Sequence, residues 1–199
     1  LTPGQLNVSS EIFQDLIAEH PMHRLLQGEV GSGKTIVALR AALSVIDASA
    51  QVALLAPTEV LAQQHFRTIT KQLGELATKG KLGAPDNAIA IALLTGSLSS
   101  SEKKEIHAKI QSGEIDLTIG THALLSDAVS FKDLGLVIVD EQHRFGVEQR
   151  DALRAKAVTP PHLLVMTATP IPRTVAITVF GDLDISTLSE LPLGRTPIT

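Results

Sequence analysis

Short, nearly uninterrupted apolar runs alternate along the chain with segments of helical apolar spacing. The runs predict strands over residues 52–56, 88–94, 117–120, 134–140 and 163–167, and the pair Leu25 and Leu26 leads into a glycine-rich turn. Helices are predicted over residues 35–46, 60–73, 99–110, 147–157 and 173–180, the third opened by a capping box of Ser99 and Glu102. Apolar strands that alternate with helices are typical of a parallel sheet covered on both faces. We therefore expect an α/β fold with a mostly parallel sheet.

Three segments lie outside this alternation of strands and helices. Ile12, Phe13, Leu16 and Ile17 form one helical stripe, which predicts a helix packed on the sheet. Residues 74–88 contain three glycines, a proline and two lysines and are predicted to form a loop or insertion. Two prolines and a glycine in residues 191–199 predict a linker that leaves a domain formed by residues 1–190.

The turn after the first strand carries a phosphate-binding pattern. Its residues are Gly28-Glu29-Val30-Gly31-Ser32-Gly33-Lys34-Thr35, which fit G-x-x-x-x-G-K-[ST] between a strand and a helix. Such a loop turns its backbone N–H groups inward, and the helix N-terminus adds partial positive charge. Lys34 is expected to reach the β and γ phosphates of a nucleotide, and the Thr35 hydroxyl to ligate Mg²⁺. The alternative is a glycine-rich turn without a ligand.

A pair of carboxylates closes the most apolar of the predicted strands. Asp140 and Glu141 follow residues 134–139, and ligands of parallel sheets bind beyond the carboxyl ends of the strands. Asp140 is therefore predicted to be the second protein anchor of Mg²⁺, and Glu141 to polarise the attacking water. The alternative is two acidic residues that cap a following helix.

Composition narrows the classes of function. The chain of 199 residues has no stretch near the ~20 apolar residues that a membrane-spanning helix needs, so no membrane partner is expected. It has no cysteine, which excludes disulfides and thiolate metal sites and fits a reducing cytoplasm. A net charge of −4 argues against a stand-alone DNA binder, and an aromatic content of 3% argues against base stacking as the main mode of binding.

With these motifs assembled, the chain resembles a known family. Asp-Glu-x-His at 140–143, in a protein with a phosphate loop, is similar to the helicases and translocases of superfamily 2. The resemblance extends to the first motor domain of the bacterial RecG helicases, which act on branched DNA. It is carried by residues 21–28, 56–62, 94–97, 120–122, 140–147, 167–174 and 190–197. The transcription-repair coupling factor has a similar motor around 144–146 and 167–174. Gln142 and residues 24–27 favour RecG, and Glu29, where the family has Asp, is a conservative departure.

The resemblance assigns roles to individual residues. It implies a RecA-like three-layer domain in which Lys34, Asp140, Glu141 and His143 serve catalysis. By the same resemblance Gln5 is implied to read the adenine edge of the nucleotide, and a plain surface glutamine is the alternative. The implied coupling residues, which sense the γ phosphate, are Gln142, Thr167, Thr169 and Arg173, and plain strand-end capping is the alternative for the two threonines. The implied DNA-backbone contacts are Pro57, Thr58, Glu59, Gly96, Ser97, Thr121 and His122, and helix capping or a plain turn is the alternative for Thr58 and Gly96-Ser97.

The same resemblance implies a larger machine. Such motors bind ATP between two similar domains, and the second domain supplies arginines that neutralise transition-state charge. We therefore expect a half-motor that is nearly inactive alone and whose parent remodels replication forks and Holliday junctions in DNA repair and recombination. Arg144, Arg150 and Arg173 are expected either in the interdomain machinery or in surface salt bridges. A non-hydrolytic nucleotide switch and a phosphate-loop enzyme unrelated to DNA remain the alternative functions.

Overall fold

The computed structural model describes residues 1–140, 152, 155–172, 174 and 183–189. Two of the predicted helices, 147–157 and 173–180, lie largely outside the described residues, and so does the whole of the predicted linker at 191–199. The part of the chain before residue 140 contains the phosphate loop and most of the sheet, so the site can be built from it.

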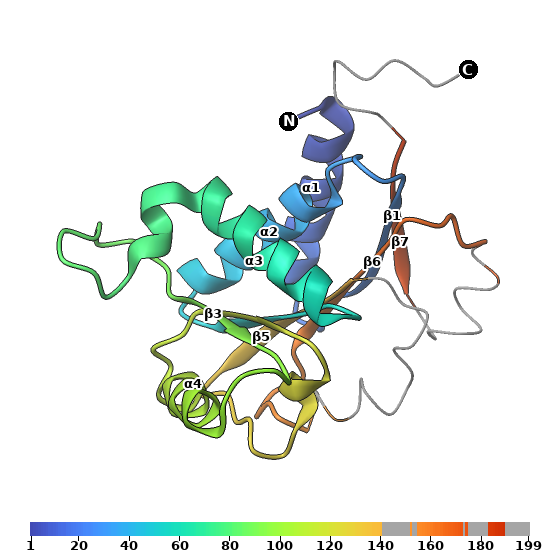
Figure 1. Ribbon diagram of the computed structural model, residues 1–199. Helices are drawn as coiled ribbons and strands as arrows, with labels where there is room; N and C mark the ends of the chain where they lie inside the picture. The colour runs from blue at the N-terminus through green and yellow to red at the C-terminus, as the bar shows by residue number, and fades with distance from the viewer. Residues whose placement is uncertain (141–151, 153–154, 173, 175–182, 190–199) are drawn as a thin grey trace.

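A parallel sheet forms the middle layer (Figure 1). Within the described residues it has seven strands, in the order β3-β4-β2-β5-β6-β1-β7, and every pairing between neighbours is parallel. The strands are β1 His23–Gly28, β2 Gln51–Leu55, β3 Ile91–Leu94, β4 Leu117–Gly120, β5 Leu134–Asp140, β6 His162–Thr167 and β7 Asp184–Leu188. β5 and β6 come late in the sequence yet lie between β1 and β2. The order in which strands are added to the sheet therefore reverses between β1 and β2. Ligands of doubly wound sheets bind at such a switch.

Helices cover both faces of the sheet, as Figure 1 shows. The helices α1 Pro3–Leu16, α2 Lys34–Asp47 and α3 Glu59–Leu73 lie on one face, and α4 Ser100–Ser112 lies on the other. Side-chain caps define three of the starts: Thr2 for α1, Thr58 for α3 and Ser99 for α4. Among the described residues, no helix combines the length and the apolar character that a membrane span requires.

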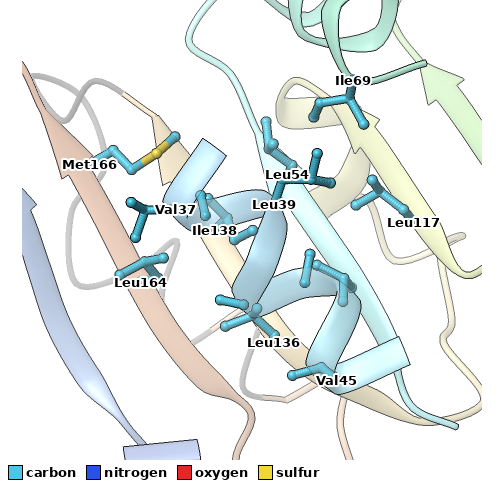
Figure 2. Packing of buried hydrophobic residues seen from close by; sticks show 14 of the residues in the cluster. Val37, Leu39, Val45, Leu54, Ile69, Leu117, Leu136, Ile138, Leu164 and Met166 are labelled. Atoms are coloured by element: carbon cyan, nitrogen blue, oxygen red, sulfur yellow. The ribbon is translucent and has the colours of Figure 1, made fainter. Parts of the chain in front are cut away.

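Alternating residues of each central strand feed two separate cores. Leu136 and Ile138 of β5 face α2 and α3, whereas Val137 and Val139 face the α4 side. Figure 2 shows the first core, where Val37 and Val45 of α2 lie over β5 and β6. Burial of both strand faces requires the continuous apolar pattern seen in the sequence, and the expected three-layer α/β fold is confirmed.

Three details differ from the sequence-based expectations. Strand β7 was not predicted, because it offers no apolar run: Asp184 and Thr187 are exposed, and polar Ser186 is buried along with Leu188. Strand β3 begins at Ile91 rather than at residue 88. The stripe on α1 is partly wrong: Ile12 is buried, but Phe13 and Ile17 are 50% and 64% exposed, and Val8 packs inward instead.

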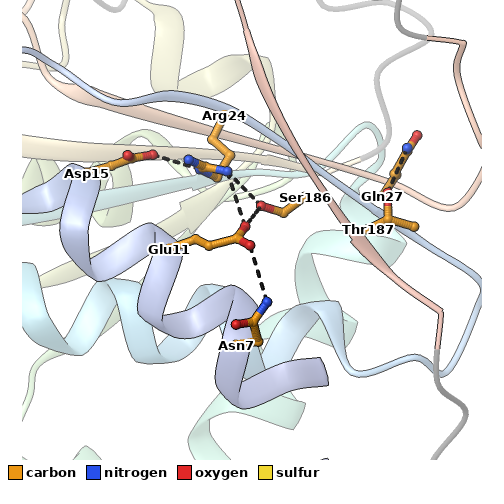
Figure 3. Close-up of polar contacts among 7 residues, drawn as sticks. All are labelled: Asn7, Glu11, Asp15, Arg24, Gln27, Ser186 and Thr187. Atoms are coloured by element: carbon orange, nitrogen blue, oxygen red, sulfur yellow. Dashed lines mark hydrogen bonds and ion pairs between the residues drawn. The ribbon is translucent and has the colours of Figure 1, made fainter. Parts of the chain in front are cut away.

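A buried arginine ties the unpredicted edge strand to the first helix. Arg24 of β1 donates from Nε to Asp15 (2.7 Å) and from Nη1 to Ser186 Oγ (2.7 Å), as Figure 3 shows. The Ser186 hydroxyl in turn donates to Glu11, which also forms an ion pair with Arg24 at 3.4 Å. Because the guanidinium carries several donors in a fixed plane, one side chain joins α1, β1 and β7.

Candidate nucleotide site and nucleic-acid interface

The predicted nucleotide-binding residues meet at one edge of the sheet. In the register of the central strands, Gln27 lies opposite Thr167 and Asp140 lies opposite Met166. The carboxyl ends of β1, β6 and β5 are therefore neighbours, and the phosphate loop, Thr167 and Asp140 emerge side by side. Pairing in the sheet brings together residues more than one hundred positions apart.

The phosphate loop has the backbone that its glycines permit. Gly31 and Gly33 have φ of 88° and 89°, in the left-handed region that other residues avoid. A Cβ on Gly33 would lie 2.2 Å from Gln5 Nε2, so no larger residue fits there without displacing that amide. Gly33 also caps α2, and Lys34 follows as its first residue. The Lys34 ammonium is folded into the loop, where it donates to the carbonyls of Gly28 (2.6 Å) and Glu29 (2.9 Å).

Gln5 reaches the loop from the first turn of α1. It is 4% exposed, and its Nε2 donates to Ser32 O at 2.9 Å. Its Oε1 accepts from the backbone N–H of Thr2 at 3.0 Å, which completes a capping box with the Thr2 hydroxyl. Both ends of the Gln5 amide are therefore engaged by protein, and its expected contact with an adenine edge stays a prediction.

Asp140 faces the phosphate loop across a cavity of about 310 Å³. The cavity is lined by residues of the phosphate loop and of the strand ends beside it, together with one residue of α3: Val30, Gly31, Gly33, Lys34, Thr35, Ile36, Gln72, Asp140 and Ala168. The Asp140 carboxylate and the Thr35 hydroxyl, which both belong to lining residues, are oxygen donors of the kind that Mg²⁺ prefers, next to backbone that can hold phosphates. The Asp140 carboxylate is also engaged by His65 of α3, whose Nε2 lies 2.5 Å from Oδ2.

The end of β6 is a compact polar turn. Thr167 is buried, and its hydroxyl accepts from the backbone N–H of Thr169 (3.2 Å) and lies 3.0 Å from the Thr169 hydroxyl. Gln27, one residue before the phosphate loop, holds the next part of this segment by accepting from Ile171 N at 3.1 Å. The same Gln27 donates to Thr187 of β7 at 2.9 Å (Figure 3). One side chain thus connects three strand ends.

The residues predicted to contact DNA gather at the other half of the same edge. They follow β2, β3 and β4, which are adjacent in the sheet. Thr58, Gly96, Ser97 and His122 are exposed, whereas Thr121 is 9% exposed. Two of these loops are joined directly, because Glu59 accepts from Ser97 N at 3.0 Å. Lys103 adds a cation by donating to Gly96 O at 2.6 Å.

The remaining predicted residues lie outside the described part of the chain. They are Glu141, Gln142, His143, Arg144, Arg150 and Arg173. Thr58 is confirmed as the N-cap of α3, since its hydroxyl accepts from Leu61 N at 3.2 Å. This cap is compatible with a phosphate contact, because one hydroxyl satisfies only some of the free N–H groups at a helix start.

Three contacts of the site were missed in the sequence. His65 lies 75 residues from Asp140, and only the path of α3 over the sheet brings them together. Gln27 was noted only as part of the approach to the loop. The capping box of Thr2 and Gln5 had a signal, since Thr-x-x-Gln before a helix is a known start pattern.

Comparison with known proteins agrees with this geometry. The model of the DEAD/DEAH box helicase family matches residues 2–178. The chain belongs to the DEAD/DEAH box helicase family. It is 63% identical over 200 residues to the ATP-dependent DNA helicase RecG of Mycobacterium tuberculosis, covering all of this chain and 27% of that protein. It is 49% identical to the RecG of Aquifex aeolicus, covering all of this chain and 24% of that one.

Solved structures of helicases share the fold. A RecG bound to a three-way DNA junction superposes with a TM-score of 0.80 and 44% identity, covering all of this chain and 25% of that one. The Hef helicase domain of Pyrococcus furiosus gives a TM-score of 0.66 at 21% identity, over 93% of this chain and 37% of that one, which shows the fold alone. The expected RecA-like helicase fold and the likeness to RecG are confirmed. The chain spans about a quarter of the length of the RecG relatives.

Proposed function

We propose that the chain is the ATP-binding half of an ATP-dependent motor that moves on double-stranded DNA and remodels branched structures. The observation that carries this proposal is the cavity between the phosphate loop and Asp140, in a chain that is 63% identical to a helicase named ATP-dependent. The branched substrate is supported by the related RecG, whose structure holds a three-way DNA junction.

The chain's own residues suit the binding of a nucleotide with its cation. Gly31 and Gly33 give the phosphate loop its left-handed turns, and the Lys34 ammonium can leave its two carbonyl partners for a phosphate oxygen. The Thr35 hydroxyl and the Asp140 carboxylate, both in the lining of the cavity, would hold Mg²⁺. When bound, Mg²⁺ neutralises charge on the β and γ phosphates. Glu141 follows Asp140 directly and would orient the attacking water, with His143 near it in sequence.

Coupling of hydrolysis to movement would depend on the polar turn at the end of β6. The hydroxyls of Thr167 and Thr169 already form a compact network beside β5 and β1. In this proposal Gln142 and Arg173 act with them to sense the γ phosphate. The Gln27 contact with Ile171 links this turn to the strand that leads into the phosphate loop.

The exposed edge after β2, β3 and β4 would follow the DNA backbone. The N-terminus of α3 at Thr58 presents N–H groups and a hydroxyl, which are common phosphate contacts. The Glu59–Ser97 bond holds Gly96 and Ser97 beside this helix start, and Thr121 and His122 follow the strand between them. With few cations here, shape and backbone donors rather than strong electrostatic attraction would set the contact.

A second motor domain and a DNA-recognition wedge of the parent chain are the proposed partners. The chain covers about a quarter of its RecG relatives, so those proteins have room for both. The second domain would supply the arginines that complete the ATP site. The relatives are bacterial proteins that act on DNA, and we place this motor in the cytoplasm with its substrate.

The test is nucleotide binding and turnover by a protein that contains both motor domains, with a branched duplex present. Glu141→Gln is expected to retain ATP binding and to abolish turnover, because the water loses its base while the phosphate loop is intact. Unchanged turnover in this variant would refute the role of Glu141. Brisk turnover that ignores DNA would instead support a phosphate-loop enzyme unrelated to DNA.

A further inference from the structure

We propose that His65 is a positioning residue for Asp140: it holds one carboxylate oxygen so that the other faces the cation of the bound nucleotide. This inference rests on the proposed function, since it assumes that Asp140 anchors Mg²⁺. It adds a residue from α3 to a site otherwise built from strand ends and the phosphate loop.

The contact has a defined donor and acceptor. His65 Nε2 lies 2.5 Å from Asp140 Oδ2, and the two side chains are 13% and 14% exposed. Because a carboxylate without a proton can only accept, the proposal assigns the proton of this bond to Nε2. The bond engages Oδ2, and Asp140 lines the same cavity as Lys34 and Thr35, so the proposal assigns Oδ1 to the cation. A carboxylate fixed at one oxygen cannot rotate freely, so its second oxygen keeps one direction.

The helix that carries His65 connects the two halves of the site. α3 starts at Thr58, its first residue Glu59 accepts from Ser97 N, and His65 follows less than two turns later. The helix packs on the sheet through Ala62 and Ile69, both buried, which fixes its rotation and depth. The position of His65 is therefore set by the packing of α3 on the sheet, and the helix joins the loop after β3 to the carboxylate of Asp140.

The expected effect of losing this bond is specific. Hydrogen-bond partners of metal ligands commonly contribute 10–100-fold to metal affinity, because they orient the ligand before the metal arrives. Loss of the donor should therefore weaken the part of nucleotide binding that depends on Mg²⁺, by about 10-fold or more. Binding without the cation depends on the phosphate loop, which His65 does not line, and should change little.

The experiment compares His65→Phe with His65→Gln in the full chain. Phenylalanine keeps a ring of similar size without the donor, whereas the glutamine amide places an N–H at a similar reach from the backbone. The same two substitutions at His107, on α4 across the sheet, serve as matched controls. The readout is the Kd of a fluorescent ATP analogue with excess Mg²⁺ and with EDTA, beside the urea midpoint of unfolding.

The measured quantity is the Kd in EDTA divided by the Kd in Mg²⁺. The proposal expects this ratio to fall by about 10-fold or more in His65→Phe and to stay near its wild-type value in His65→Gln and in both His107 variants. A wild-type ratio in His65→Phe would overturn it. Equal weakening with and without Mg²⁺, with glutamine no better than phenylalanine, would also overturn it, because that result describes a packing role. If the unaltered chain binds the analogue in neither buffer, also when it is joined to its parent's second motor domain, the proposed function itself fails, and this inference fails with it.

Discussion

Gly33→Ala tests whether the phosphate loop is shaped by contact with α1. Gly33 has φ of 89°, and a Cβ added there would lie 2.2 Å from Gln5 Nε2, far inside van der Waals contact. An L-residue in this left-handed region costs about 1–2 kcal/mol. Displacing the Gln5 amide breaks its buried bond to Ser32 O, and an unsatisfied buried group costs about 1–3 kcal/mol. The expected loss of stability is therefore about 2–5 kcal/mol.

Gly83→Ala provides the matched control. Gly83 has φ of 82°, but nothing lies within 4 Å of its added Cβ, so only the backbone cost of about 1–2 kcal/mol applies. The gain from a stiffer unfolded chain is the same for both substitutions and cancels in the comparison. The difference between the two variants thus isolates the clash with Gln5, at about 1–3 kcal/mol.

Urea unfolding followed by circular dichroism measures this difference. With a slope of about 2 kcal/mol per molar urea, the two midpoints should differ by about 0.5–1.5 M. Adding Gln5→Ala should make Gly33→Ala no more costly than Gly83→Ala, because the obstructing amide is gone. If the two glycine variants unfold at the same urea concentration, or if Gln5→Ala does not rescue, the close approach of α1 to the loop is not a determinant of stability.

Three further outcomes are expected. Arg24→Met should lower the free energy of unfolding in urea by about 1–3 kcal/mol, because the bonds that join α1 to β7 are lost. The loss is limited because the carboxylates of Glu11 and Asp15 are partly open to water. A loss below about 0.5 kcal/mol would contradict the account. Burial lowers the pKa of His162, and nearby Asp15 offsets part of this effect. The folded protein therefore favours the neutral imidazole, so the contribution of His162 to stability is complete above about pH 6.5 and is lost as the pH falls. His162→Asn, which can still accept from Met22 N, should weaken the decline in urea stability from about pH 7 to pH 5, and an unchanged decline would refute this. Thr58→Ala should lower the free energy of unfolding by about 1 kcal/mol, whereas Thr58→Ser should change it very little because serine keeps the capping hydroxyl. If both variants match wild type, the cap does not contribute to stability.

The sequence was sufficient for the parts of the fold that repeat a physical pattern. Strand β5 is apolar on both faces because helices cover both, and the capping box at Ser99 is local, so both could be predicted. Strand β7 could not, because an edge strand held by Arg24 and Ser186 needs no apolar run. Phe13 looked like core because helical spacing gives the relative angle of side chains, not which of them meet a neighbour.

In the site, too, local sequence patterns could be predicted, whereas contacts between distant elements could not. The phosphate loop and Asp140 were predicted because their chemistry requires fixed residue types at fixed positions along the chain. The Gln5–Ser32 and His65–Asp140 contacts join elements 27 and 75 residues apart, and their partners are specified only by how α1 and α3 lie on the sheet. The roles of Glu141, His143 and Arg173 stay predictions.

Steady-state ATP hydrolysis tests the half-motor account most directly. The chain alone, the same chain joined to its parent's second motor domain, and a Lys34→Ala version of the joined protein are each measured with and without a branched duplex. The account predicts almost no turnover by the chain alone, since a missing arginine can cost about 10³–10⁵ in rate, and DNA-stimulated turnover by the joined protein that Lys34→Ala abolishes. Brisk, DNA-stimulated turnover by the chain alone would contradict it, because the site would then be complete without a second domain.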